Sequence, residues 1–89
     1  MFEPLNNFQL TEMAFKIESD LALHAVGRRQ LGNDKLLALR NVVRMTTQEV
    51  NRRTPVPDDV SFDARTMRRA ADALKWAAEE INRHVVEVF

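Results

Sequence analysis

Two histidines and thirteen carboxylates are the side chains of this chain that could carry acid–base or metal chemistry, and the chain has no cysteine. His24 and His84 fall on different expected helices, and neither belongs to a His-x-x-x-His or Glu-x-x-His pattern. Zinc and di-iron sites ordinarily need more donors than this, held at such spacings. We therefore predict no metal site and no cofactor, and we interpret His24 as a residue at the edge of the core.

Catalysis by paired carboxylates or by an activated serine is not indicated either. The adjacent Glu79 and Glu80 point to different faces of a helix. No spacing places two carboxylates, or a Ser-His-Asp set, on one wall of a pocket. The sequence predicts a protein that is not an enzyme.

Arginine has the clearest potential for ligand binding, because its guanidinium fork fits phosphate oxygens. Arg40 and Arg44 are spaced one helical turn apart. Arg65 and Arg69 fall in the first turns of a later expected helix, near the positive end of its dipole. These four arginines are the candidate phosphate-binding residues.

The same charges also fit a solvated surface that is held by salt bridges. On the last expected helix, four pairs have the spacing of intrahelical ion pairs, namely Arg68 with Asp72, Lys75 with Glu79, Glu79 with Arg83, and Arg83 with Glu87. The chain is neutral in total, although residues 28–53 carry seven bases and two acids while residues 1–27 carry one base and four acids. We expect the basic middle to pair with the acidic flanks, within the chain or between subunits. A neutral domain is a poor generic DNA binder, so DNA is not an expected partner.

Three amphipathic segments must position these side chains. We expect helices over about 8–31, 34–53 and 61–87, packed as an antiparallel three-helix bundle in one all-α domain, 1–89. The predicted buried positions follow helical spacing and are Leu10, Ala14, Ile17 and Leu21 in the first helix, Leu36, Leu39, Val43, Thr46 and Val50 in the second, and Met67, Ala71, Leu74, Ala78, Ile81, Val85 and Val88 in the third.

Polar and glycine residues mark the expected helix ends. Asn7 is the predicted N-cap of the first helix, and the Gly32-Asn33 pair is its predicted stop, although Gly27 could end or kink it earlier. Ser61 or Asp59 is the predicted N-cap of the third helix.

The only tryptophan, Trp76, lies opposite the predicted buried stripe of the third helix, among charged residues. Tryptophan is enriched at binding hot spots, so Trp76 is a candidate interface residue. The alternative is that this helix has two neighbours and that Trp76 covers the flank of the bundle. The apolar end of the helix adds Val85, Val88 and Phe89 as candidate interface residues, and it predicts a dimer or higher oligomer.

No apolar run approaches the 18 residues that a bilayer-spanning helix needs. The N-terminal residues lack the basic stretch and apolar core of a signal peptide. We therefore predict a soluble cytoplasmic protein without a membrane partner.

Three features of the second half of the chain are shared with a known family: Ala38-Leu39-Arg40, a proline fifteen residues on at Pro55, and the run from Ala73 to Arg83. In these features, which cover about half of the chain, the sequence resembles a phage family that sequesters cyclic oligonucleotide signals and so blunts bacterial anti-phage defence. The expected helix from Leu10 to Leu31 and the 54–61 loop depart from that family, so its N-terminal ligand contacts cannot be placed here.

The resemblance implies an oligomer that binds signal nucleotides at subunit junctions, in a bacterial or phage-infected host cell, with arginines such as Arg65 or Arg69 as phosphate contacts. The leading hypothesis from the residues themselves is a non-enzymatic helical oligomer that acts by binding another protein, as a regulator, inhibitor or adaptor. The nucleotide-sequestering function is the second hypothesis, and a structural part of a larger assembly is the third.

Overall fold

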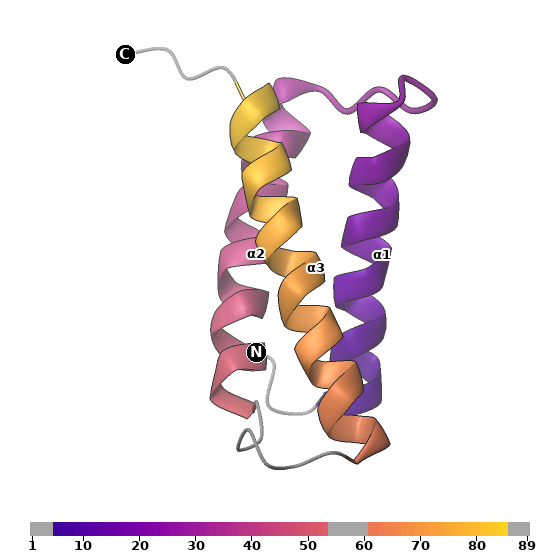
Figure 1. Cartoon of the computed structure of the whole chain (residues 1–89). Helices are drawn as coiled ribbons and strands as arrows, with labels where there is room; N and C mark the ends of the chain where they lie inside the picture. The colour runs from indigo at the N-terminus through magenta and orange to yellow at the C-terminus, as the bar shows by residue number, and fades with distance from the viewer. Residues whose placement is uncertain (1–4, 54–60, 86–89) are drawn as a thin grey trace.

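Three helices follow one another along the chain and pack side by side (Figure 1). The computed structural model describes residues 5–53 and 61–85. Helix α1 is Asn7–Ala25, α2 is Asn33–Arg53 and α3 is Phe62–His84, and these described ranges contain no strand. Helix α3 packs extensively against both α1 and α2, which touch each other much less. The predicted all-α three-helix bundle is confirmed.

Helix α1 begins one residue earlier than predicted. Asn6, and not Asn7, is the N-cap: its side chain accepts a 2.8 Å hydrogen bond from the Gln9 backbone N–H. The Gln9 side chain accepts a 3.0 Å bond from the Asn6 N–H in return. This reciprocal capping box satisfies two amides that the helix leaves unpaired, and it explains the start of α1.

Helix α1 ends at Ala25, so the predicted continuation to Leu31 and the stop at Gly32-Asn33 are wrong. Gly27 has a φ of 77°, in the left-handed region. Its N–H donates to the carbonyl of His24, and the Arg28 N–H donates to the carbonyl of Leu23. These two bonds form a Schellman motif, which glycine stabilises because it has no Cβ to clash.

The other helix ends differ less from expectation. The Gly32 carbonyl accepts a hydrogen bond from the Leu36 N–H, so Gly32 directly precedes α2 and does not end α1. Ser61 caps α3 as predicted, its side chain accepting a 3.2 Å bond from the Ala64 N–H. Asp59 lies outside the described residues. Helix α3 ends at His84, before the predicted residue 87, because Val85 adopts extended angles (φ −73°, ψ 131°).

The core lies along the inner faces of all three helices. Every predicted core position of α1 is buried, and α2 buries its predicted set except Leu39, which is half-buried. On α3 the buried stripe is wider than predicted, because this helix faces two neighbours. The predicted Ala71, Ala78 and Val85 are half-buried, and the fully buried stripe is Ala64, Met67, Ala70, Ala73, Leu74, Ala77 and Ile81, with Glu80 beside it.

Among the helices that the structure describes, none combines the length and apolar character that a bilayer-crossing segment requires.

Val88, which was predicted to be buried, lies outside the described residues.

Candidate functional site

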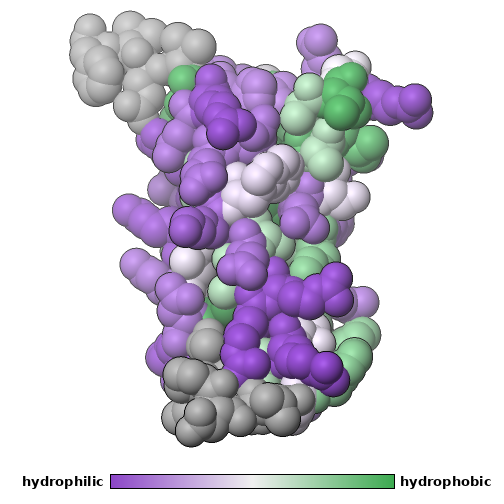
Figure 2. Space-filling view, in the orientation of Figure 1, coloured by the Kyte–Doolittle hydropathy of each residue, from purple (hydrophilic) through white to green (hydrophobic). Residues whose placement is uncertain are grey.

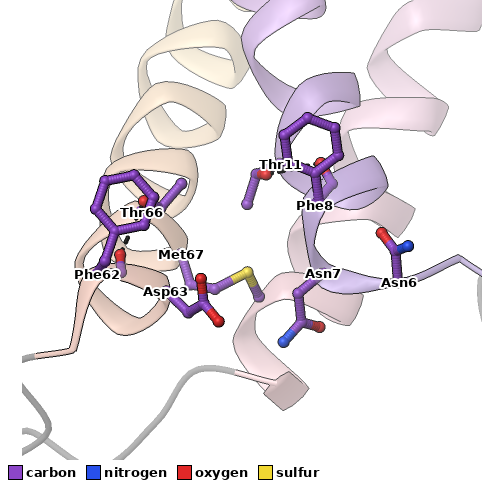
Figure 3. A pocket seen from close by; sticks show the side chains of 8 residues that line it. All are labelled: Asn6, Asn7, Phe8, Thr11, Phe62, Asp63, Thr66 and Met67. Atoms are coloured by element: carbon purple, nitrogen blue, oxygen red, sulfur yellow. Dashed lines mark hydrogen bonds between the residues drawn. The ribbon is translucent and has the colours of Figure 1, made fainter.

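The largest exposed apolar side chains outline a groove between the N-terminal ends of α1 and α3. Phe8 is 69% exposed and Phe62 is 75% exposed. Figure 3 shows one ring on each side of the groove, with the Met67 side chain between the two helices. The cavity is about 280 Å³ and is lined by Asn6, Asn7, Phe8, Thr11, Phe62, Asp63, Thr66 and Met67. We call it the Phe8–Phe62 groove.

The polar side chains of the groove are partly occupied within their own helices. The Thr11 hydroxyl donates a 2.8 Å hydrogen bond to the Phe8 carbonyl, and the Thr66 hydroxyl donates a 2.9 Å bond to the Phe62 carbonyl. Both hydroxyl groups therefore already have a hydrogen-bond partner within their own helix. Asp63 supplies the carboxylate among the lining residues.

Sequence reasoning missed both phenylalanines as interface candidates. Each lies in the first turn of its helix, outside the buried stripe. A large aromatic residue at a position that the helical period assigns to solvent is the signal that could have identified them, and it was applied only to Trp76.

Trp76 is half-buried and packs against the core, as the alternative interpretation expected. Val85 is also half-buried and packs there, while Val88 and Phe89 lie outside the described residues. Among the described residues, the large exposed apolar side chains lie elsewhere. Val26, for example, is 69% exposed at the C-terminal end of α1, where Figure 2 shows hydrophobic atoms on the surface.

The four candidate phosphate-binding arginines do not form one site. Arg40 and Arg44 line a second groove, about 300 Å³ in volume, with Thr47 and Gln48 of α2 and Asn82 of α3 among its other walls. Arg65 and Arg69 are exposed on α3. They lie thirteen and nine residues before Ala78, which also lines that groove. At 1.5 Å per residue this is a separation of roughly 13–20 Å along the helix.

The ion pairs of the structure follow a different pattern from the predicted one. Arg83 pairs with Glu80 at 2.8 Å, and the predicted partner Glu79 makes no ion pair with any described residue. Among the described residues, an ion pair joins the basic middle to the acidic N-terminal part of the chain: Arg29 Nη1 lies 2.7 Å from Asp20 Oδ1. Glu87 lies outside the described residues.

Buried Glu49 is held by two arginines of the last turn of α2. Arg52 Nε donates to Glu49 Oε2 at 2.8 Å, and Arg53 Nε donates to Glu49 Oε1 at 3.3 Å. Hydrogen bonding from Arg52 and the charges of both arginines lower the Glu49 pKa from 4.5 to about 2, against the opposing effect of burial. This cluster therefore stays fully charged across the physiological pH range.

The tertiary structure brings the two histidines together at the end of the bundle where α1 and α3 terminate. The ring centroids of His24 and His84 are 4.9 Å apart, in an edge-to-face arrangement. His84 Nε2 lies 3.0 Å from Glu80 Oε1. In the described part of the chain, no three histidine or carboxylate side chains converge as a metal-binding group.

No protein-family model, curated protein or solved structure matches this chain. The resemblance of its second half to the phage signal-sequestering family therefore stays a prediction, and inferences about function rest on the surfaces described above.

Proposed function

We propose that this chain is a non-enzymatic helical module that acts by binding another protein through the Phe8–Phe62 groove. The observation that carries the proposal is the pair of phenylalanines, more than two-thirds exposed, on either side of one cavity. Exposed aromatic side chains lower the solubility of a monomer and do not stabilise its fold, whereas they are common anchors in protein interfaces.

The composition of the groove indicates what kind of partner would fit. Its walls are mostly apolar, and Asp63 is the only charged residue among those that line it. A partner segment with apolar side chains and a nearby lysine or arginine would bury both rings and pair with Asp63. A second copy of the chain is one candidate partner, because the apolar end of the third helix predicts a dimer or higher oligomer.

Photo-crosslinking tests the proposal directly. Benzoylphenylalanine placed at position 8 or 62 should crosslink the same partner in cells, while benzoylphenylalanine at the equally exposed position 26 should not. The double variant Phe8→Ala/Phe62→Ala should lose that partner and keep its unfolding temperature, because neither ring is buried. Equal crosslinking from position 26, or an undiminished complex of the double variant, would refute the groove as the interface.

Native mass spectrometry separates self-association from binding to a different protein. A discrete oligomer that dissociates in the double variant supports a second copy as the occupant. A monomer that still gives the same crosslinked product from positions 8 and 62 supports another protein.

We also propose a second function, the binding of a phosphate-bearing ligand such as a nucleotide, because Arg40 and Arg44 line one groove with the amides of Gln48 and Asn82. Guanidinium groups would hold phosphate oxygens, and amides could bond a base edge. Nucleotide-sized added mass on the native protein would support this function.

Charge reversal locates the ligand. Arg44→Glu should abolish binding if the α2–α3 groove is the site, and Arg69→Glu should abolish it if the exposed arginines of α3 are. Both variants replace an exposed arginine that makes no ion pair with the described residues. An affinity that neither variant changes would rule out both sets of arginines.

A further inference from the structure

We propose that His24 is an acid-sensitive latch on the connection between α1 and α2, residues 26–32. His24 lies in the last turn of α1, and its Nδ1 atom lies 3.1 Å from the backbone nitrogen of Leu31. The same Nδ1 atom lies 3.2 Å from the carbonyl oxygen of Arg29. One ring nitrogen thus faces a donor and an acceptor of the same connection.

The protonation state of the ring, and its tautomer when it is neutral, decide which of these two bonds exists. A neutral imidazole that carries its proton on Nε2 accepts the hydrogen bond from the Leu31 N–H through the Nδ1 lone pair. A protonated imidazolium has a hydrogen on Nδ1, so it can donate only to the Arg29 carbonyl, and the Leu31 N–H loses its acceptor.

The surroundings of the two bonds favour the Leu31 bond at neutral pH. The bond to Leu31 is partly buried, whereas the contact with Arg29 is exposed. Water can therefore solvate the Arg29 carbonyl, but a partly buried N–H without a partner is costly. We infer that the neutral His24 ring holds the connection in place through its bond with the Leu31 N–H, and that protonation of the ring breaks this bond.

Helix α3 faces His24 with His84 and the charged side chains that contact it. The His84 ring lies 4.9 Å from the His24 ring between centroids, and its Nε2 atom lies 3.0 Å from Glu80 Oε1. Glu80 is shared with Arg83, which pairs with it at 2.8 Å. A protonated His24 would place its positive charge beside the His84 ring.

The other elements around His24 carry charges of both signs. Arg29 of the connection pairs with Asp20 of α1 at 2.7 Å. Arg28 is exposed on the same connection, and the first turn of α2 exposes Asp34 and Lys35, one charge of each sign.

Opening the latch would alter a third groove. Arg29, Gln30 and Leu31 form one wall of a cavity of about 560 Å³ between α1 and α2, opposite Leu39 and Val42. Histidine ordinarily changes charge between pH 5 and 8. We therefore expect the wall formed by residues 29–31 to be held in place at neutral pH and to become more mobile in mild acid.

Nitrogen-15 NMR of the purified chain tests the latch. At pH 8, His24 Nδ1 should show the chemical shift of an unprotonated, hydrogen-bonded nitrogen. As His24 titrates, the hydrogen-exchange protection of the Leu31 amide, corrected for the intrinsic rate at each pH, should fall by about tenfold, the size expected for one lost hydrogen bond. The Arg28 amide, which bonds to the Leu23 carbonyl, is the internal control and should keep its protection.

Two variants make the test specific. His24→Asn places an amide oxygen near the Nδ1 position and cannot titrate, so Leu31 should stay protected at all pH values. His84→Gln leaves His24 and its contacts with residues 29 and 31 in place, so acid should still lower the Leu31 protection in this variant. A proton on Nδ1 at pH 8, or an equal loss of Leu31 protection in His24→Asn, would overturn the proposal.

Discussion

The guanidinium of Arg53 donates a 2.7 Å hydrogen bond from Nη1 to the carbonyl oxygen of Leu5, forty-eight residues earlier in the chain. The same nitrogen lies 3.2 Å from the Asn7 side-chain oxygen. The Arg53 side chain is only 14% exposed. Arg53, at the end of α2, therefore holds the residues that lead into α1 in place, beside the Phe8–Phe62 groove.

Replacing Arg53 should destabilise the fold. Arg53→Ala removes a partly buried, charged hydrogen bond to a backbone carbonyl and one partner of Glu49, and we expect a loss of about 1.5–3 kcal/mol in the free energy of unfolding. Urea unfolding followed by circular dichroism measures it. Arg44→Ala, an exposed arginine of the same helix, is the control and should change stability by less than about 0.5 kcal/mol. Equal effects of the two variants would contradict a structural role for Arg53.

Acid should weaken the fold through Glu49. Its pKa is lowered from 4.5 to about 2 in the folded chain, chiefly by the Arg52 hydrogen bond, so the folded state binds a proton less readily than the unfolded state does. The contribution of this carboxylate is therefore complete above about pH 4.5 and is lost as pH falls toward 2. Urea midpoints over this range should fall more steeply in the wild type than in Glu49→Gln, and parallel curves would exclude the effect.

The two glycines should respond differently to alanine. Gly27→Ala forces a Cβ into a residue with a φ of 77°, and we expect a cost of about 1 kcal/mol in unfolding free energy although no atom lies within 4 Å of the new Cβ. Gly32 has the same open space and no positive φ, so Gly32→Ala should be nearly neutral. Thermal unfolding of both variants decides the point. A Gly27→Ala variant as stable as Gly32→Ala would exclude the left-handed turn.

Trp76 should contribute to stability as well as to any interface. Because its side chain is half-buried against the core, Trp76→Ala should cost about 1–3 kcal/mol, whereas Trp76→Phe should recover part of that loss. Phe8→Ala, which truncates an exposed ring, should leave stability within about 0.5 kcal/mol. Chemical denaturation of the three variants tests this, and an unaltered Trp76→Ala midpoint would mean that the indole contributes no packing.

The sequence by itself determined the number of helices, their approximate extent and the buried faces of α1 and α2. Leu10, Ala14, Ile17 and Leu21 recur at the helical period, and burial of such a stripe is the dominant favourable contribution to folding. Local signals also compete within a sequence. Gly27 and Gly32 both satisfied the rule for a helix stop, and only the formed Schellman bonds show that Gly27 ends α1.

Tertiary structure alone decided which remote side chains meet. The position of α3 between α1 and α2 moved its buried stripe onto Ala70, Ala73 and Ala77 and half-covered Trp76. It also brought His24 to His84 and placed Phe8 across a groove from Phe62. Helical periodicity specifies a face within one helix, whereas contacts between helices depend on rotation and crossing, which arise only when all three faces pack against one another.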